Sequence, residues 1–319
     1  MKLLVAYDGS ACSEAALDDL VRAGLPESSE AHVISVAEVW LPVASNESAA
    51  PSTIGGSPEL SKRVESGNRI LAEVEVLANH AKRRIQRMFP SWRVTSEAID
   101  GSPARAILER AADTAPDLII VGSHGRSAIS RHFLGSISQK VLTEAKCCVR
   151  VARGRINVDR APTRLIIGFD GSTGAQMAVS AIIARSWSAW TEIRLIVATS
   201  ETTPAAIDRF VLPNDHKASE ISNRERDSIE RLAARSLDAL RAKNVPATLH
   251  LYSGNPKDII VEEANRWSAD CIYLGASSLG SDADYMALGS TAGAVAARAA
   301  CSVEIVRQAR SGTELLTRP

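Results

Sequence analysis

Short runs of hydrophobic residues alternate along the chain with longer segments in which hydrophobic residues recur at helical spacing. The short runs lie near residues 2–7, 31–38, 93–98, 118–122 and 148–152, and again near residues 164–169, 193–199, 247–252, 271–275 and 302–307. Runs this short and this continuous predict buried strands. Residues 61–88 place hydrophobic side chains three and four positions apart, with charged residues between them, and Pro90 follows, which predicts a long helix.

The second half of the chain repeats the first. Residues 2–10 read KLLVAYDGS and residues 164–172 read RLIIGFDGS, while VRVAR at residues 149–153 matches VEIVR at residues 303–307. The order and spacing of such matches indicate that a whole domain was duplicated, with a period too long for a solenoid. We therefore expect two domains, at residues 1–154 and 163–308, joined by a short polar linker.

The alternation of strands and helices also predicts the fold class. It is typical of an α/β protein, here with two tandem doubly wound, Rossmann-like domains that each contain a five-stranded parallel sheet. Ser102 and Asn255, each followed by proline, predict the start of a third helix in each half. Residues 40–60 and 201–218 are rich in Ser, Ala, Pro or Thr and are expected to form surface loops.

Composition and charge exclude several classes of protein. The 319 residues carry 37 basic and 37 acidic side chains, balanced within each half, so no basic arm indicates a nucleic-acid or membrane partner. The hydrophobic runs are far shorter than the roughly 20 residues that cross a bilayer, and the chain starts without the pattern of a signal peptide. We therefore expect a cytoplasmic protein. The five cysteines include no CxxC pair, which argues against a zinc site.

The candidate chemistry lies after the fourth strand of the first half. Residues 122–136 read GSHGRSAISRHFLGS, in which two glycines are followed, nine residues later, by Gly135 and Ser136 at the start of a predicted helix. Glycine permits positive φ angles and lets main-chain N–H groups approach an anion, and a helix start adds unpaired N–H groups and a positive dipole end. In an open parallel sheet, ligands bind beyond the carboxyl ends of the strands, where the strand order reverses, which points to strands one and four. Strand one of the first half ends at Asp8. The segment therefore predicts a phosphate site.

Three side chains near this segment have two interpretations each. Asp8 precedes Gly-Ser, where it would either contact a nucleotide or only close the turn. Arg126 would face either the phosphates or the solvent. His124 invites a catalytic interpretation, but no partner stands at an informative spacing, which favours a solvated loop histidine.

These motifs resemble the universal stress protein family, specifically its tandem two-domain members, over residues 1 to about 308. The resemblance is carried by residues 5–10, residues 101–103 and the spaced glycines and serine of residues 122–136. It implies that the glycines and Ser136 contact the phosphates and ribose of ATP, that Asp8 holds the adenine or ribose end, and that Val36 packs near the base. The full set of candidate nucleotide-binding residues is Asp8, Val36, Gly122, Ser123, His124, Gly125, Arg126, Gly135, Ser136, Ile137 and Ser138. Mg²⁺ would accompany the phosphates and would be held mainly by phosphate oxygens and water.

The second half departs from this motif. Ser278 stands at the second glycine position, and the loop carries Asp282 and Asp284 where the first half carries arginines. Each carboxylate close to a triphosphate repels it by about 1 kcal/mol per charge pair even in water. We therefore expect the first half to bind ATP, and the second half to bind none or a less anionic ligand.

Three functions remain open. We favour an ATP-binding stress-response or regulatory module without efficient catalysis. The alternatives are a slow ATP hydrolase or adenylating enzyme of the adenine nucleotide α-hydrolase type, and an interaction protein with vestigial sites. The sequence has no SGGxDS loop, no GxxxxGK[ST] motif and no HxGH motif, which argues against an enzyme.

The resemblance has an implication for assembly as well. It implies that single-domain relatives form dimers through the fifth strand. In a tandem chain the two fifth strands can pair internally and form a pseudo-dimer, which leaves no long exposed edge there. A further homodimer stays open, and the sequence names no protein partner.

Overall fold

The computed structural model describes residues 1–39, 58–125, 134–154, 162–199, 215–276 and 288–308 of the chain. Its ten strands each begin and end within two residues of a predicted strand and confirm the predicted order. They are β1 (Lys2–Ala6), β2 (Glu30–Ala37), β3 (Arg93–Asp100), β4 (Leu118–Gly122) and β5 (Cys148–Ala152), followed by β6 (Thr163–Gly168), β7 (Thr191–Thr199), β8 (Ala247–Ser253), β9 (Cys271–Gly275) and β10 (Ser302–Val306).

The helices connect successive strands, as the alternating pattern requires. They are α1 (Ala11–Asp19), the 3-10 turn η1 (Leu20–Arg22), α2 (Pro58–Met88), α3 (Pro103–Thr114) and α4 (Ser136–Glu144) in the first half, and α5 (Thr173–Ile183), α6 (Asp215–Arg241), α7 (Pro256–Trp267) and α8 (Ser290–Arg298) in the second. Ser102 and Asn255 stand at the expected helix starts, but only Asn255 caps its helix, by accepting a hydrogen bond from Lys257 N.

The ends of the two expected loops are helical instead. Helix α2 begins at Pro58 and α6 at Asp215, so the last residues of segments 40–60 and 201–218 are helical. Their remaining residues up to 57 and 214 lie outside the described part of the chain.

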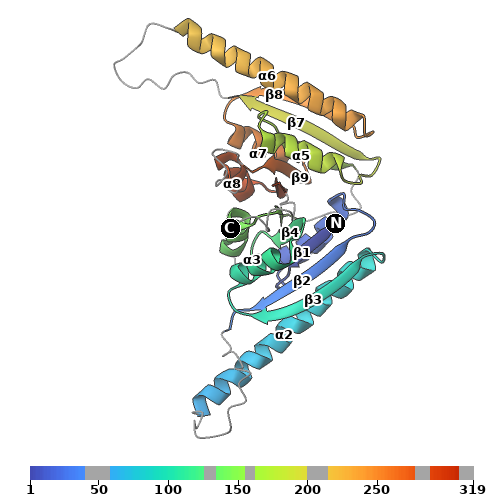
Figure 1. Ribbon diagram of the computed structural model, residues 1–319, viewed down its shortest axis with the longest axis vertical. Helices are drawn as coiled ribbons and strands as arrows, with labels where there is room; N and C mark the ends of the chain where they lie inside the picture. Colours follow the sequence, from blue (N-terminus) through green and yellow to red (C-terminus); the bar gives the residue numbers. More distant parts are fainter. Residues whose placement is uncertain (40–57, 126–133, 155–161, 200–214, 277–287, 309–319) are drawn as a thin grey trace, which may run out of the picture.

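All ten strands form one continuous sheet in the order β3-β2-β1-β4-β5-β10-β9-β6-β7-β8. Within each half the neighbouring strands are parallel, and the predicted doubly wound α/β fold is confirmed. The halves meet where β5 and β10 pair antiparallel, with Val303 opposite Val151 and Ile305 opposite Val149. Figure 1 shows the sheet running from one half into the other, with α2 and α6 at its two ends.

The two faces of the sheet differ at this junction. One hydrophobic cluster runs through both halves on the face covered by α3, α4, α7 and α8, and it includes Val149 of β5 and Ile305 of β10. The opposite face has two separate clusters, one under α1 and α2 and the other under α5 and α6. Because successive strand residues point to opposite faces, Arg150 and Glu304 lie on this second face, between its two clusters.

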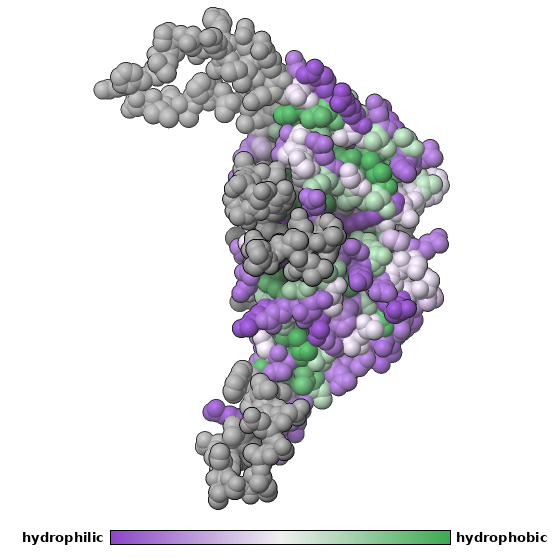
Figure 2. Space-filling view, viewed as in Figure 1, coloured by the Kyte–Doolittle hydropathy of each residue, from purple (hydrophilic) through white to green (hydrophobic). Residues whose placement is uncertain are grey.

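The described surface carries hydrophobic and hydrophilic residues side by side. Figure 2 shows green (hydrophobic) and purple (hydrophilic) residues interspersed over the coloured surface of both halves on the face in view. Among the described residues, no helix combines the length and the hydrophobicity needed to cross a membrane.

Candidate functional site

The candidate site lies where the neighbouring strands β1 and β4 end side by side. Strand β1 lies between β2 and β4, so the chain order reverses at this point, and ligands of open parallel sheets generally bind beyond the carboxyl ends of the strands at such a point. Residues 7–10 follow β1, and residues 123–125 follow β4. A hydrogen bond of 2.8 Å from Gly135 N to Ser123 O adds the start of α4 to the same place. Three segments that are distant in the sequence therefore meet.

Three glycines make this convergence possible, for a reason that the sequence analysis did not give. None of Gly122, Gly125 and Gly135 has a positive φ, so Gly122 and Gly125 do not use the left-handed freedom expected of them. A Cβ atom on Gly122 would lie 2.7 Å from the main-chain carbon of Cys12 in α1. A Cβ atom on Gly125 would lie 3.2 Å from Asp8 Oδ2, and one on Gly135 would lie 3.2 Å from a main-chain oxygen that follows β4. The glycines are needed for close approach.

Two helices start at the site, and they differ in capping. The first turn of α1 is capped by Ser10, whose Oγ accepts a hydrogen bond of 3.1 Å from Ser13 N. Helix α4 follows Gly135, which has no side chain and makes no side-chain cap. The N–H groups of Ser136 and Ile137 have no acceptor within the helix, because they belong to its first turn. Helix α4 therefore offers an anion main-chain donors and the positive end of its dipole.

Two serine hydroxyls of the site bind the protein itself. Ser138 Oγ donates to Gly122 O at 2.6 Å, and Ser10 Oγ donates to His124 O at 3.3 Å. These bonds hold the chain after β4 against α4 and α1. Ser136 is exposed at the start of α4, so its N–H and hydroxyl are the groups that a ligand would meet.

His124 has one ring nitrogen engaged and the other buried. Its Nδ1 lies 3.1 Å from Ser123 Oγ, whereas Nε2 is buried without a hydrogen-bond partner among the described residues. The side chain as a whole is half-buried, so it is less solvated than expected. Burial, and then the nearby Arg153 guanidinium, lower the pKa of the imidazole, so the ring is neutral at pH 7. In the neutral tautomer that carries its proton on Nε2, the ring would donate a hydrogen bond to an anion, and Nδ1 would then act only as an acceptor.

Asp8 performs the turn role that the sequence left open. Its Oδ1 accepts a hydrogen bond of 3.0 Å from Ser10 N, and Asp170 accepts the matching bond from Ser172 N at 3.0 Å. Because both halves keep this bond, it does not distinguish them. The other oxygen of Asp8 lies beside Gly125, at the site.

The remaining predicted residues lie at the margin of the site or outside the described chain. Val36 lies at the end of β2 and Ile137 in the first turn of α4, and both are half-buried against the cluster that crosses the junction. Arg126 and Arg131 fall in residues 126–133, which the structure does not describe. No group of three or more His, Cys, Asp or Glu residues in the described segments could hold a metal ion.

Two side chains that the sequence analysis did not single out also belong here. Cys12 Sγ accepts a hydrogen bond of 3.6 Å from Ser123 Oγ, which ties the first turn of α1 to the chain after β4. Arg153, only 8% exposed, donates through Nη1 to Ala297 O and Ala299 O of the other half, at 3.0 and 2.6 Å. The sequence could have indicated Arg153, because the second half has Arg307 at the same position of the repeat.

The second half has the same arrangement of strand ends and helix starts, and its main-chain segments approach each other more closely. Gly174 stands where the first half has Cys12, and a Cβ atom on Gly275 would lie 2.1 Å from the main-chain carbon of Gly174. Helix α8 begins after Gly289 without a side-chain cap, as α4 does after Gly135. The residues on which the expected loss of binding rests, Ser278, Asp282 and Asp284, lie outside the described chain. The difference between the two sites therefore stays a prediction.

Known proteins share both the sequence pattern and the fold of this chain. The universal stress protein family model matches residues 1–153 and again residues 162–307. A universal stress protein from Thermus aquaticus is 31% identical over 158 residues, which span 47% of this chain and 97% of that protein. One from Mycobacterium tuberculosis strain H37Rv is 25% identical over 246 residues, 76% of this chain and 78% of that protein. The crystal structure of a universal stress protein from Archaeoglobus fulgidus shares the fold over 97% of both chains, at 18% identity and a TM-score of 0.55. The chain therefore belongs to the universal stress protein family and carries two of its domains in tandem.

Proposed function

We propose that this protein is an ATP-binding regulatory module of the stress response, whose first half binds ATP with Mg²⁺ and does not turn it over efficiently. The observation that carries the proposal is the uncapped start of α4, which meets the glycine-lined chain after β4. Helix starts of this kind bind phosphates, because their N–H groups point at the anion and the helix dipole favours negative charge. Mg²⁺ would be held by phosphate oxygens and water.

The charges near the site support a nucleotide with its phosphates toward α4. Asp8 is a carboxylate, so it suits ribose hydroxyls or the adenine amino group, and like charge makes it a poor neighbour for phosphates. His124 Nε2 is a buried polar atom that lacks a partner within the described chain, on the loop that α4 contacts. The proposal therefore assigns the sugar or base end to Asp8 and the phosphates to Ser136, Ile137 and the loop.

The absence of efficient catalysis is part of the proposal. The sequence lacks the three phosphate-chemistry motifs considered above. The imidazole of His124 contacts Ser123 through Nδ1, and its lowered pKa limits its use as a base near neutrality. A slow ATP hydrolase is the alternative, and quantification of ADP over hours separates the two.

Assembly and location complete the proposal. We infer that the β5–β10 contact acts as an internal pseudo-dimer, in place of the dimer contact that the resemblance implies for single-domain relatives. We place the protein in the cytoplasm, because its five cysteines are free, which suits a reducing compartment.

The proposal is tested by adding one negative charge at the start of α4. Ser136→Asp leaves the fold intact and favours the helix, since acidic residues stabilise a helix N-terminus, but it repels phosphate. We expect ATP affinity to fall about tenfold or more, with the melting temperature unchanged or raised. Ser290→Asp at the matching start of α8 is the control and should leave ATP affinity unchanged. Equal affinities of the wild type and Ser136→Asp would contradict the proposal.

A further inference from the structure

Two residues of opposite charge face each other at the junction between the halves. Arg150 is the central residue of β5, Glu304 is the central residue of β10, and the antiparallel ladder places them directly opposite each other. They also occupy the same position of the repeated sequence, in VRVAR and VEIVR. The approximate twofold axis that relates the halves therefore passes between these two residues.

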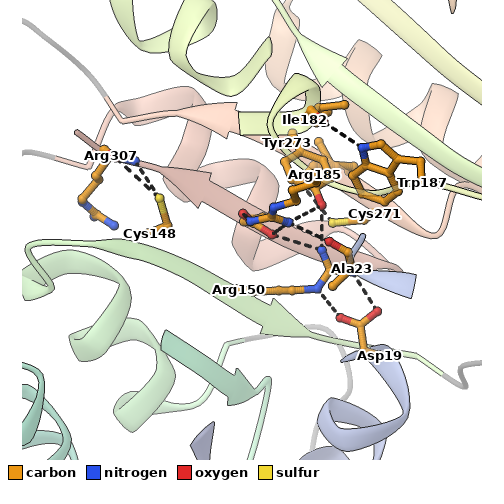
Figure 3. A network of polar contacts seen from close by, with 12 residues as sticks. Asp19, Ala23, Cys148, Arg150, Ile182, Arg185, Trp187, Cys271, Tyr273 and Arg307 are labelled. Atoms are coloured by element: carbon orange, nitrogen blue, oxygen red, sulfur yellow. Dashed lines mark hydrogen bonds and ion pairs between the residues drawn. The ribbon is translucent and has the colours of Figure 1, made fainter. Parts of the chain in front are cut away.

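Both side chains are fully buried within a network of alternating charges. Arg150 donates to Asp19 at 2.5 and 2.9 Å and to Glu304 at 3.1 Å, and Glu304 accepts a further bond from Arg185 at 2.9 Å. The hydroxyl of Tyr273 accepts from both guanidiniums, at 3.0 and 2.9 Å. Figure 3 shows Arg150 with Asp19 on one side of its guanidinium and Arg185 and Tyr273 on the other. Burial alone would raise the pKa of Glu304, but the two arginines outweigh it and lower that pKa, so the carboxylate is ionised.

Each half contributes a different part of the network. The first half supplies Asp19 and Arg150, and the second supplies Glu304, Arg185 and Tyr273. In the repeated frame Ala181 stands where the first half has Asp19, and Ala23 stands where the second half has Arg185. Each half therefore carries a counter-charge only for its own central residue, Asp19 for Arg150 in the first half and Arg185 for Glu304 in the second.

Pairing between identical halves would break this network. Two first halves joined through β5 would place Arg150 opposite its own copy, and two second halves would place Glu304 opposite its own copy. The two like charges would repel in a water-free environment, each balanced only by the counter-charge of its own half, and the hydrogen bonds of Arg150 to Glu304 and Tyr273 would be lost with no solvent to replace them. The opposite face of the same strands is hydrophobic, with valines and Ile305, and would not discriminate between the alternatives.

We propose that β5 and β10 are edges matched to each other by charge, so that each edge accepts the other half and rejects a second copy of itself. The partner that fits a β5 edge is then a β10 edge of this same protein. Any assembly through these strands, including exchange of halves between two chains, contains one first half for every second half.

The first test separates the halves only after the whole chain has folded. A protease site is inserted within residues 155–161, the intact protein is purified and cleaved, and unlabelled and ¹⁵N-labelled cleaved samples are mixed. Native mass spectrometry should find only complexes of one first half with one second half, including mixed-label pairs. Homodimers of either half would overturn the proposal.

The second test reverses one charge. Glu304→Arg places an arginine opposite Arg150, and Glu304→Gln keeps an acceptor oxygen without the charge. Circular dichroism of the intact variants first establishes that they fold. After cleavage, the dissociation constant of Glu304→Arg should exceed that of Glu304→Gln by about tenfold or more, because repulsion is added to the lost attraction. A cleaved Glu304→Arg complex as tight as the wild type would overturn the proposal, and the wild-type exchange test decides the matter independently if this variant does not fold.

Discussion

Arg307, at the end of the second half, donates a hydrogen bond to the main-chain oxygen of Leu142 in the last turn of α4. The first turn of that helix lies at the candidate nucleotide site, so α4 connects the site of one half to a side chain of the other. Arg153 makes the matching contacts with Ala297 and Ala299 at the end of α8. Each half therefore holds the last helix of the other by its carboxyl end, where a cation complements the helix dipole.

Removing either arginine should destabilise the protein. Arg307→Met leaves buried carbonyl oxygens at the end of α4 without their donor, and we expect a loss of about 1–3 kcal/mol in the free energy of unfolding. Urea denaturation measures this loss, and Arg153→Met, which acts on α8, should cost a similar amount. Unchanged unfolding midpoints for both variants would show that these contacts do not stabilise the junction.

Stability should also depend on pH through Glu304. Its pKa in the folded protein lies below the ordinary value of 4.5, because Arg185 and Arg150 outweigh the effect of burial. Its stabilisation is therefore complete above that ordinary value and is lost as the pH falls through the lower, folded pKa. The unfolding free energy of the wild type should fall more steeply than that of Glu304→Gln between about pH 5 and pH 3. Parallel curves for the two proteins would contradict this role.

His124 should report on the ligand. Burial and Arg153 hold the pKa of its imidazole below 6.5, and a polyphosphate nearby would favour the cationic form and raise that pKa. Titration by NMR with and without ATP and Mg²⁺ measures the change. His250 on β8, whose pKa burial and Arg194 also lower, is the matched control and should not respond. Identical titration of His124 in both samples would place the phosphates elsewhere.

The glycines of the site should differ in their tolerance to substitution. Gly122→Ala forces a methyl group against the main chain of α1, and we expect a loss of about 1–3 kcal/mol in stability. Gly125→Ala meets only the end of the Asp8 side chain among the described residues, so its cost should stay below about 1 kcal/mol while ATP binding weakens. Thermal unfolding ranks the two variants, and an equal loss of stability would argue against the close contact at Gly122.

The fold could be predicted from the sequence because its strands are short, continuous hydrophobic runs. Leu118 to Val121 is such a run and is fully buried, as parallel strands covered on both faces require. The repeated DGS motif identified the turns after β1 and β6, where Asp8 and Asp170 make the same bond. These features depend on local sequence, and local sequence was sufficient for them.

The parts that the sequence did not predict depend on contacts between distant residues. The reason for Gly122 lies in Cys12 of α1, which no local motif indicates. The buried network at the junction was missed as well, because Arg150 and Glu304 are charged residues inside hydrophobic strands. Their opposite signs at equivalent positions of the repeat were a usable signal, but only the antiparallel ladder shows that they face each other.

The measurement that tests the central claim most directly is calorimetric titration of the intact chain with millimolar ATP and Mg²⁺. The account predicts saturable heat with a stoichiometry of one ATP per chain, bound by the first half. No heat at any ATP concentration, or two equivalent sites per chain, would contradict it.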